Sequence, residues 1–181
     1  MTEPETAPRD AKAEETRRRI CAAVVACLDD SGYAETSIGR VQARAGVSRG
    51  ALTHHFPTKQ ALMAETAMRL LAVAVSPLRN RGTAPVDQLL TSTWKTIVNT
   101  AEGRAFVEIL VACRTDSALD AVVAEALRQW DEDVSQAVER AYRGEADGDA
   151  ALLWSICRAF IRGLLIHERF VRDPERLSAM M

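Results

Sequence analysis

The stretch TSIGRVQARAGVSRGALTHHF, residues 36–56, decides the fold of this chain. Its apolar residues Ile38, Val41 and Ala45 recur at the three- and four-residue spacing of one helix face. Gly46 then ends this helix, because glycine takes the left-handed backbone of a sharp turn without steric cost. The pattern predicts a short helix followed by a tight turn.

A second short helix is predicted to begin at Ser48, whose hydroxyl is suited to accept a hydrogen bond from a free amide of the next turn. Val47 before this cap and Leu52 four residues after it are placed as a hydrophobic staple, which fixes the angle of the second helix. Two helices held at a set angle leave one side free. This is the arrangement of a helix-turn-helix, whose second helix enters the major groove of DNA.

A longer run, AGVSRGALTHHFPTKQAL preceded by GYAETSIGRV, resembles the DNA-binding segment of the tetracycline-repressor (TetR) family of bacterial transcription regulators. The resemblance covers about residues 12–70 and rests on the order of Gly-Tyr, Thr-Ser, Ala-Gly-Val-Ser, His-Phe-Pro and Lys. It implies a dimer that binds operator DNA and a small-molecule effector. One position departs from the family: Thr53 stands where a tyrosine usually reaches a phosphate.

The expected DNA-binding surface lies on and around the motif. Its candidate residues are Thr36, Ser37, Arg40, Arg44, Ser48, Arg49, Gly50, Thr53, His54, His55 and Lys59. Arg49 is the main candidate for base recognition, because a guanidinium can hold the O6 and N7 atoms of guanine; clasping a phosphate is its alternative role. Gly50 has no side chain, so the backbone at the start of the second helix can approach the groove. His54 is the second candidate for contacting base edges.

Other candidates have structural roles beside their DNA roles. Thr36 and Ser37 are predicted to cap the first motif helix, and Thr36 is also a candidate phosphate contact. Ser48 is likewise a candidate both for capping the second motif helix and for contacting a phosphate. By resemblance, His55 and Lys59 contact phosphates, and Lys59 falls in the first turn of the next helix, where free amides also attract phosphate.

The distribution of charge supports a DNA-binding end. The whole chain has a net charge of −2, but residues 36–69 carry five basic residues against one acid, whereas residues 70–181 carry 13 basic and 16 acidic residues. A small basic module on an acidic body is expected when only one end meets phosphate. An ordinary solvated charged face is the alternative, and charge alone does not separate the two.

Composition favours an all-α fold, since the chain is 48% hydrophobic, only 5% aromatic and poor in glycine and proline. We expect a flexible tail over residues 1–11, a helix-turn-helix DNA-binding domain over residues 12–70, and a helical regulatory and dimerisation domain over residues 71–181. The first helix is predicted to end at Gly32, and Tyr33 is expected to fill the small three-helix core.

The larger domain shows helical apolar patterns throughout, with a break expected at Gly103. Its last two long helices, about residues 117–143 and 149–172, are joined by a brief loop and are predicted to form an antiparallel pair. Leu119, Val122 and other apolar residues are expected to face inward on the first of them. The pair has more apolar surface than one small body covers, so we expect a homodimer through these helices, as the resemblance also implies.

The resemblance also implies that a small molecule enters the core of the larger domain and shifts the DNA-binding heads. The candidate pocket residues are Trp94, Phe106, Leu110, Cys113, Arg114 and Trp130, with Arg114 as a polar anchor. Ordinary core packing explains each apolar residue of this set as well. The identity of the effector does not follow from the sequence.

No pattern for catalysis, a cofactor or a metal is present in the sequence: it contains no HExxH, no glycine-rich phosphate loop, no GxSxG and no CxxC pair. We therefore expect a protein that is not an enzyme. We find no signal peptide and no apolar run close to the roughly 20 residues that span a membrane. The expected location is the bacterial cytoplasm, with no membrane partner.

Together these patterns predict a ligand-responsive transcriptional regulator, in particular a repressor that leaves a palindromic operator when a small molecule binds. One alternative is a small-molecule-binding dimer of the same fold that has lost DNA binding, for which Thr53 is the only support. A second is an all-α enzyme, whose activity would persist when Arg49 and Lys59 are removed.

Overall fold

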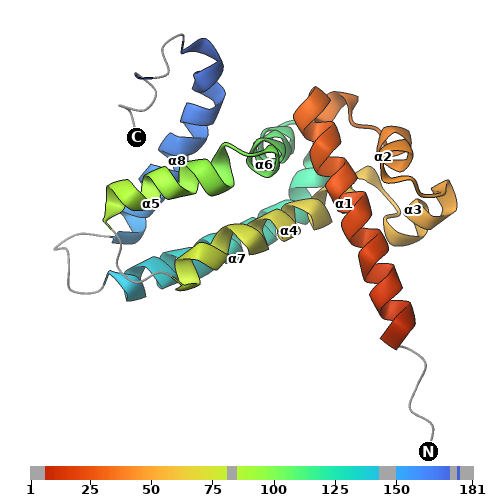
Figure 1. Cartoon of the computed structure of the whole chain (residues 1–181), viewed down its shortest axis with the longest axis horizontal. Helices are drawn as coiled ribbons and strands as arrows, with labels where there is room; N and C mark the ends of the chain where they lie inside the picture. The colour runs from red at the N-terminus through yellow and green to blue at the C-terminus, as the bar shows by residue number, and fades with distance from the viewer. Residues whose placement is uncertain (1–6, 81–84, 143–149, 172–174, 176–181) are drawn as a thin grey trace, which may run out of the picture.

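The computed structural model describes residues 7–80, 85–142, 150–171 and 175, and within them it contains helices and no strand, as the composition predicted (Figure 1). The elements in chain order are α1 (Ala7–Glu35), α2 (Ile38–Ala45), α3 (Arg49–His55), α4 (Lys59–Asn80), α5 (Val86–Thr93), the π-helical turn η1 (Trp94–Val98), α6 (Ala101–Cys113), α7 (Ser117–Ala141), α8 (Ala150–His167) and the 3-10 turn η2 (Glu168–Phe170).

The first helix differs from its prediction at its start. It begins at Ala7, inside the stretch that was expected to be a flexible tail; residues 1–6 lie outside the described residues. Gly32 leaves the helical conformation with φ 72, so the break falls at the predicted glycine. The chain then turns through Thr36 into α2, and α1 to α3 form a head at one end of the molecule (Figure 1).

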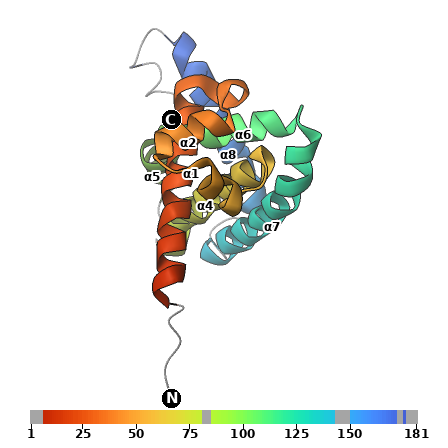
Figure 2. The same cartoon turned by 90° about the vertical axis from the view of Figure 1, so that its right-hand side faces the viewer.

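The largest hydrophobic cluster joins this head to the rest of the chain. Ile20, Val24 and Leu28 of α1 are spaced by four residues and fully buried, as their periodicity predicted. The same cluster includes Ile109 of α6 and Leu119 of α7, because α6 packs along α1 (Figures 1 and 2). The head therefore has no separate core of its own.

Tyr33 has a second role beside the predicted packing. It packs at the edge of this cluster, half-buried, and its hydroxyl donates a hydrogen bond of 2.6 Å to Asp116 at the start of α7. Burial first, and then Asp116, raise the pKa of the Tyr33 phenol. Tyr33 therefore packs at the edge of the core of the head and also connects the head to α7.

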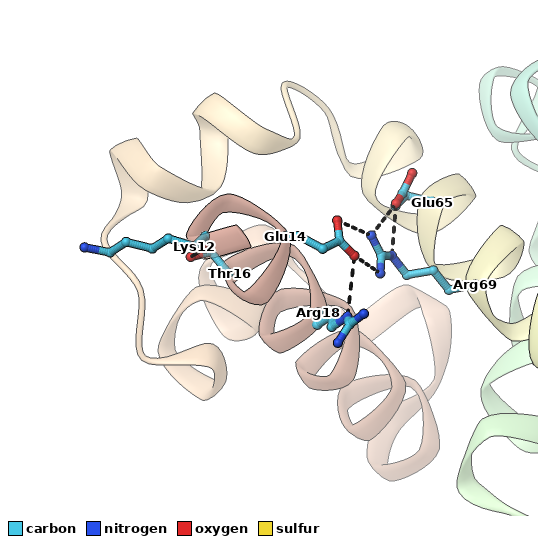
Figure 3. A network of polar contacts seen from close by, with 6 residues as sticks. All are labelled: Lys12, Glu14, Thr16, Arg18, Glu65 and Arg69. Atoms are coloured by element: carbon cyan, nitrogen blue, oxygen red, sulfur yellow. Dashed lines mark hydrogen bonds and ion pairs between the residues drawn. The ribbon is translucent and has the colours of Figure 1, made fainter. Parts of the chain in front are cut away.

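The bridging helix α4 begins at Lys59, and the hydroxyl of Thr58 caps it by accepting from the Ala61 amide at 3.0 Å. A polar cluster fastens α4 to α1: Arg69 donates to both carboxylate oxygens of Glu14, at 2.8 and 3.2 Å, and also pairs with Glu65 (Figure 3). Glu14 is thereby shared between Arg69 and its own helix neighbour Arg18. These contacts join α4 directly to the long helix of the head.

The helix break expected at Gly103 lies before this residue, between the end of η1 at Val98 and the start of α6 at Ala101. Gly103 is in the first turn of α6, whose cap is Thr100, which accepts from the Gly103 amide at 3.0 Å. A Cβ atom at Gly103 would lie 2.0 Å from the carbonyl oxygen of Val98 and 2.4 Å from that of Ile97. This glycine is needed because the backbone of η1 approaches α6 closely.

The first half of α8 packs antiparallel to the end of α7, as predicted: Trp154 lies with Val134 and Val138 in one cluster, and Arg158 pairs with Asp131. The second half of α8 leaves α7 and packs on η1 (Figure 1). Val122 of α7, expected inside, is instead 53% exposed. It lies on a helix face that packing within the chain leaves uncovered.

The C-terminal helix is more apolar than the sequence analysis expected. The stretch Ala150–Phe170 is long and apolar enough, by length and composition, to cross a membrane, and a third of its 18-residue apolar window is buried in the fold. It nevertheless carries Arg158 and Arg162 on one face. A helix that contacts the core on one side and exposes apolar residues on the other has the same composition as a membrane span.

Candidate nucleic-acid interface and ligand cavity

Caps and backbone conformation fix the two short helices of the motif. Ser37 accepts a hydrogen bond of 3.2 Å from the Arg40 amide, and Ser48 accepts one of 3.2 Å from the Ala51 amide. Gly46 adopts the left-handed conformation, with φ 62 and ψ 37. The capping roles of Ser37 and Ser48 and the turn at Gly46 are thus confirmed.

Two arginines of α1 contact the ends of the two motif helices. The Arg19 guanidinium donates to the carbonyl oxygens of Ala45 at 2.8 Å and Gly46 at 3.4 Å, which satisfies the C-terminal carbonyls of α2. The Arg17 guanidinium lies over the Phe56 ring, 5.4 Å from its centroid, where α3 ends. These contacts hold α3 at a set angle to α1.

The exposed side of α3 carries most of the candidates for DNA contact. Arg49, Gly50, Thr53 and His54 are all exposed. Within the described part of the chain, no hydrogen bond or ion pair holds the Arg49 guanidinium. The Thr53 hydroxyl donates to the Arg49 carbonyl at 2.9 Å. Arg49 is therefore available to a ligand, while Thr53 presents mainly its methyl group and hydroxyl oxygen.

The arginines of α2 are partly engaged within the head. Arg40 donates to Ser31 at 3.2 Å and to the Glu35 carbonyl at 3.1 Å, and Arg44 pairs with Asp30. All of these contacts lie at the exposed surface, where ion pairs exchange readily with other partners. Both arginines remain candidates for contacting the DNA backbone.

Two predicted phosphate contacts do not fit the geometry. The Thr36 side chain is fully buried, and its hydroxyl donates to the Gly32 carbonyl at 2.8 Å, so it completes the end of α1. The Lys59 ammonium donates to the Tyr33 carbonyl at 2.8 Å and lies 3.9 Å from the centroid of the Tyr33 ring. Burial lowers the pKa of Lys59. Both side chains face the protein and are removed from the candidate interface.

His55 is half-buried at the end of α3, between His54 and Phe56. Burial, with smaller effects of His54 and Arg17, lowers the pKa of His55 below its ordinary value of 6.5. The lowered pKa favours the neutral ring at neutral pH. The neutral ring can donate one N–H to a phosphate without carrying a charge.

A cavity of about 430 Å³ lies among the helices that follow the head. This volume falls within the usual range for small-molecule sites. Its lining residues come from α4, α5, η1, α6, α7 and α8 and include Leu71, Phe106, Trp130, Trp154, Arg158 and Arg162. The Trp130 indole donates to the Leu71 carbonyl at 3.2 Å, which joins α7 to α4 at the cavity wall. The cavity therefore touches the helix that leads to the head.

The predicted pocket set agrees only in part with this cavity. Phe106 and Trp130 line it. Trp94 instead packs in the cluster between η1 and α8, and Leu110, Cys113 and Arg114 are not among the described lining residues. The C-terminal half of α6 turns toward the head, where Cys113 packs on the largest cluster, so only the first half of α6 faces the cavity.

Comparison with known proteins gives the family. The sequence model of a family described as bacterial regulatory proteins, tetR family, matches residues 20–66. The HTH-type transcriptional regulator CymR of Pseudomonas putida is 30% identical over 179 residues, which cover 92% of this chain and 86% of CymR. This chain belongs to the tetR family. It is a helix-turn-helix transcriptional regulator, and its family is one of regulators rather than enzymes.

Other relatives agree with this assignment. The HTH-type transcriptional regulator BetI 1 of Chromohalobacter salexigens is 43% identical over 53 residues, which cover 29% of this chain and 26% of that protein. Among solved structures, Salmonella enterica GusR superposes with a TM-score of 0.70 at 24% identity, covering 92% of this chain and 91% of GusR. A transcriptional regulator of Saccharomonospora viridis, solved in complex with choline, gives a TM-score of 0.66 at 20% identity over 92% of each chain. These structures have the same fold.

This tetR-family regulator has two cavity residues that sequence reasoning missed, Arg158 and Arg162. Both stand on α8, and their four-residue spacing was a usable signal, because it places two cations on one face of an otherwise apolar helix. No cluster of three or more His, Cys, Asp or Glu suited to a metal occurs in the residues that the structure describes.

Proposed function

We propose that this tetR-family regulator is a homodimeric repressor, which binds a two-fold symmetric operator through α3 and releases it when a small molecule enters the cavity. The exposed Arg49 at the start of α3 is the observation that carries the DNA-binding part. It has a free guanidinium on a helix held in place by caps at Ser37 and Ser48. Arg49 would contact base edges, with His54 and His55 beside it.

The dimer part of the proposal rests on exposed apolar side chains. Leu152, Leu153, Ile156 and Phe160 of α8 are between 43% and 57% exposed, and Val122 of α7 is exposed to a similar degree. Such a concentration on two neighbouring helices is unusual for the surface of a monomer and typical of an interface. A second copy of the chain is the occupant that a two-fold symmetric operator requires.

Contacts between the cavity and the head support the ligand response. The cavity is lined by Leu70, Leu71, Val73 and Ala74 of α4, and α4 is fastened to α1 through Arg69 and Glu14. A ligand that fits the cavity better in one position of α4 would shift the separation of the two heads in the dimer. It can do so only by as much as its affinity differs between the two states. We place this activity in the cytoplasm, where the operator is accessible.

Selection from a pool of random-sequence DNA tests the proposal. The protein should enrich a two-fold symmetric sequence with half-site centres about 34–36 Å apart, or a multiple of one helical turn. Enrichment of no sequence would overturn the repressor assignment, and together with preserved ligand binding it would favour a small-molecule-binding dimer that has lost DNA binding.

A further inference from the structure

The cavity wall is mostly apolar, and the two basic residues in its described lining both come from α8. Phe106, Trp130 and Trp154 supply aromatic surface, and aliphatic side chains supply most of the remainder. Arg158 and Arg162 present guanidinium groups from the same face of α8. Arg158 is buried and Arg162 partly buried, and a guanidinium removed from water in an apolar cavity needs a compensating anion or acceptor.

Arg158 is only partly satisfied by the protein. It is 9% exposed, its terminal nitrogen donates to Asp131 and to Ser155, and its guanidinium lies 5.0 Å from the centroid of the Trp130 ring. Its Nε atom is buried without a hydrogen-bond partner among the described residues, and so is the indole nitrogen of Trp154. Two cavity-lining residues thus each have a buried N–H donor without an acceptor among the described residues.

Arg162 adds an uncompensated charge. Its guanidinium lies 5.5 Å from the centroid of the Phe106 ring, and no hydrogen bond or ion pair holds it within the described part of the chain. Burial first, and then the nearby Arg158, lower the pKa of Arg162, whereas Asp131 acts in the opposite direction. Asp131 of α7 therefore forms an ion pair with Arg158 and acts on Arg162 only through its charge.

One carboxylate, that of Glu102, is among the described cavity-lining residues. It is exposed, and within the described residues no hydrogen bond or ion pair joins it to Arg158 or Arg162. Asp131 forms its ion pair with Arg158, so the Arg162 guanidinium lines the cavity without an ion-pair partner among the described residues. A ligand with one negative charge would balance it.

We propose that the cavity binds a small apolar carboxylate, with its oxygens toward Arg162 and the Nε of Arg158 and its hydrocarbon part against Phe106, Trp130 and Trp154. A carboxylate fits better than a phosphate, because it brings one charge and two oxygens, which guanidinium groups hold in a planar, bidentate manner. A phosphate would bring a second negative charge, and the described lining holds no third cation to balance it. This inference rests on the proposed ligand response and names the class of its effector.

Binding of matched pairs of probes tests the inference. The probes are phenylalkanoates from benzoate to 4-phenylbutanoate, each compared with its primary amide, and binding is followed by the fluorescence of the full chain, since Trp130 and Trp154 line the cavity. At least one acid should bind about tenfold or more tightly than its amide, the difference expected for a charge-assisted hydrogen bond. Arg162→Gln should remove that preference and leave the affinity of the amide unchanged.

The amide reports whether the cavity of the variant is intact, and Arg128→Gln is the matched control, since Arg128 is exposed on α7 and pairs with Glu125 outside the cavity. If no acid binds more tightly than its amide, or if Arg162→Gln keeps the preference, the inference is overturned. Operator binding without ligand is measured separately. Its absence would overturn the proposed repressor function while leaving the acid preference measurable, so the two failures are distinguishable.

Discussion

The hydroxyl of Tyr33 donates a hydrogen bond of 2.6 Å to the carboxylate of Asp116. Gln60 of α4 donates to the same carboxylate at 3.1 Å, and Asp116 caps α7 by accepting from the Leu119 amide at 2.9 Å. One carboxylate thus joins the end of α1, the start of α4 and the first turn of α7. Since α4 and α7 also line the cavity, this carboxylate joins two cavity-lining helices to the end of α1 in the head.

Substitution Tyr33→Phe removes the hydroxyl and keeps the ring that the Lys59 ammonium covers. It should lower the unfolding temperature, because the hydrogen bond to Asp116 is lost. Asp116→Ser keeps a good helix cap and removes the same bond. The effects of the two substitutions should therefore not add in the double variant. Strictly additive changes in unfolding temperature would show that the two side chains do not act together.

Substitution Arg49→Ala should weaken binding to the selected operator by about 1–3 kcal/mol and relax the preference at one base pair of each half-site. The reason is the loss of a free guanidinium at the start of α3. Fluorescence anisotropy with operator variants measures both effects. Arg128→Ala, at an exposed position on α7, is the control and should leave affinity unchanged. Unchanged affinity and preference in Arg49→Ala would remove Arg49 from base recognition.

Substitution Lys59→Met should act on stability. The ammonium caps the Tyr33 carbonyl and covers the Tyr33 ring, so its loss should cost about 1–2 kcal/mol in the free energy of unfolding. The salt dependence of operator binding should stay as in the wild type. A salt slope lowered by about one, with unchanged stability, would instead restore the phosphate contact that the sequence predicted.

The lowered pKa of His55 gives the head a pH dependence. The unfolded chain takes up a proton at this histidine near its ordinary pKa of 6.5, and the folded chain only at lower pH. The stabilisation is therefore complete above 6.5 and is lost as the pH falls from 6.5 toward the folded pKa. His55→Gln should show a shallower fall of unfolding temperature than the wild type between about pH 7.5 and about pH 5. Equal slopes would contradict this role.

The exposed apolar face of α8 should hold the dimer. Ile156 is 57% exposed, and Ile156→Asp places a charge in the proposed interface, so light scattering should show a monomer. Operator affinity should also fall, because a monomer binds one half-site at a time. Val111→Asp is the matched control, since Val111 is 54% exposed but lies on α6. A dimer that persists in Ile156→Asp would place the interface elsewhere.

Local signals in the sequence predicted the head well. Caps at Ser37 and Ser48, the glycine at position 46 and the four-residue spacing on α1 each depend on neighbours along the chain, and each is present in the structure. The start of the first helix was less predictable, since polar residues after Ala7 show no apolar period. Contacts of this local kind require no knowledge of the tertiary fold.

Contacts between distant segments could not be predicted in the same way. Lys59 has the composition and position of a phosphate contact, but the Tyr33 carbonyl that it binds is brought near only by the packing of α4 on α1. Arg158 and Arg162 were missed because the apolar positions of α8 were treated as the informative ones, and the two cations between them were given no role. Their role depends on a cavity formed by six elements, which no local pattern describes.

The affinity of the protein for DNA flanking its own coding region tests the central claim most directly. Titration of this DNA and of a scrambled fragment of equal length and composition, over a range of salt concentrations, separates specific from electrostatic binding. At physiological salt, the flanking DNA should bind at least about a thousandfold more tightly than the scrambled fragment. Equal affinity for both fragments at every salt concentration would contradict a repressor that acts at a nearby operator.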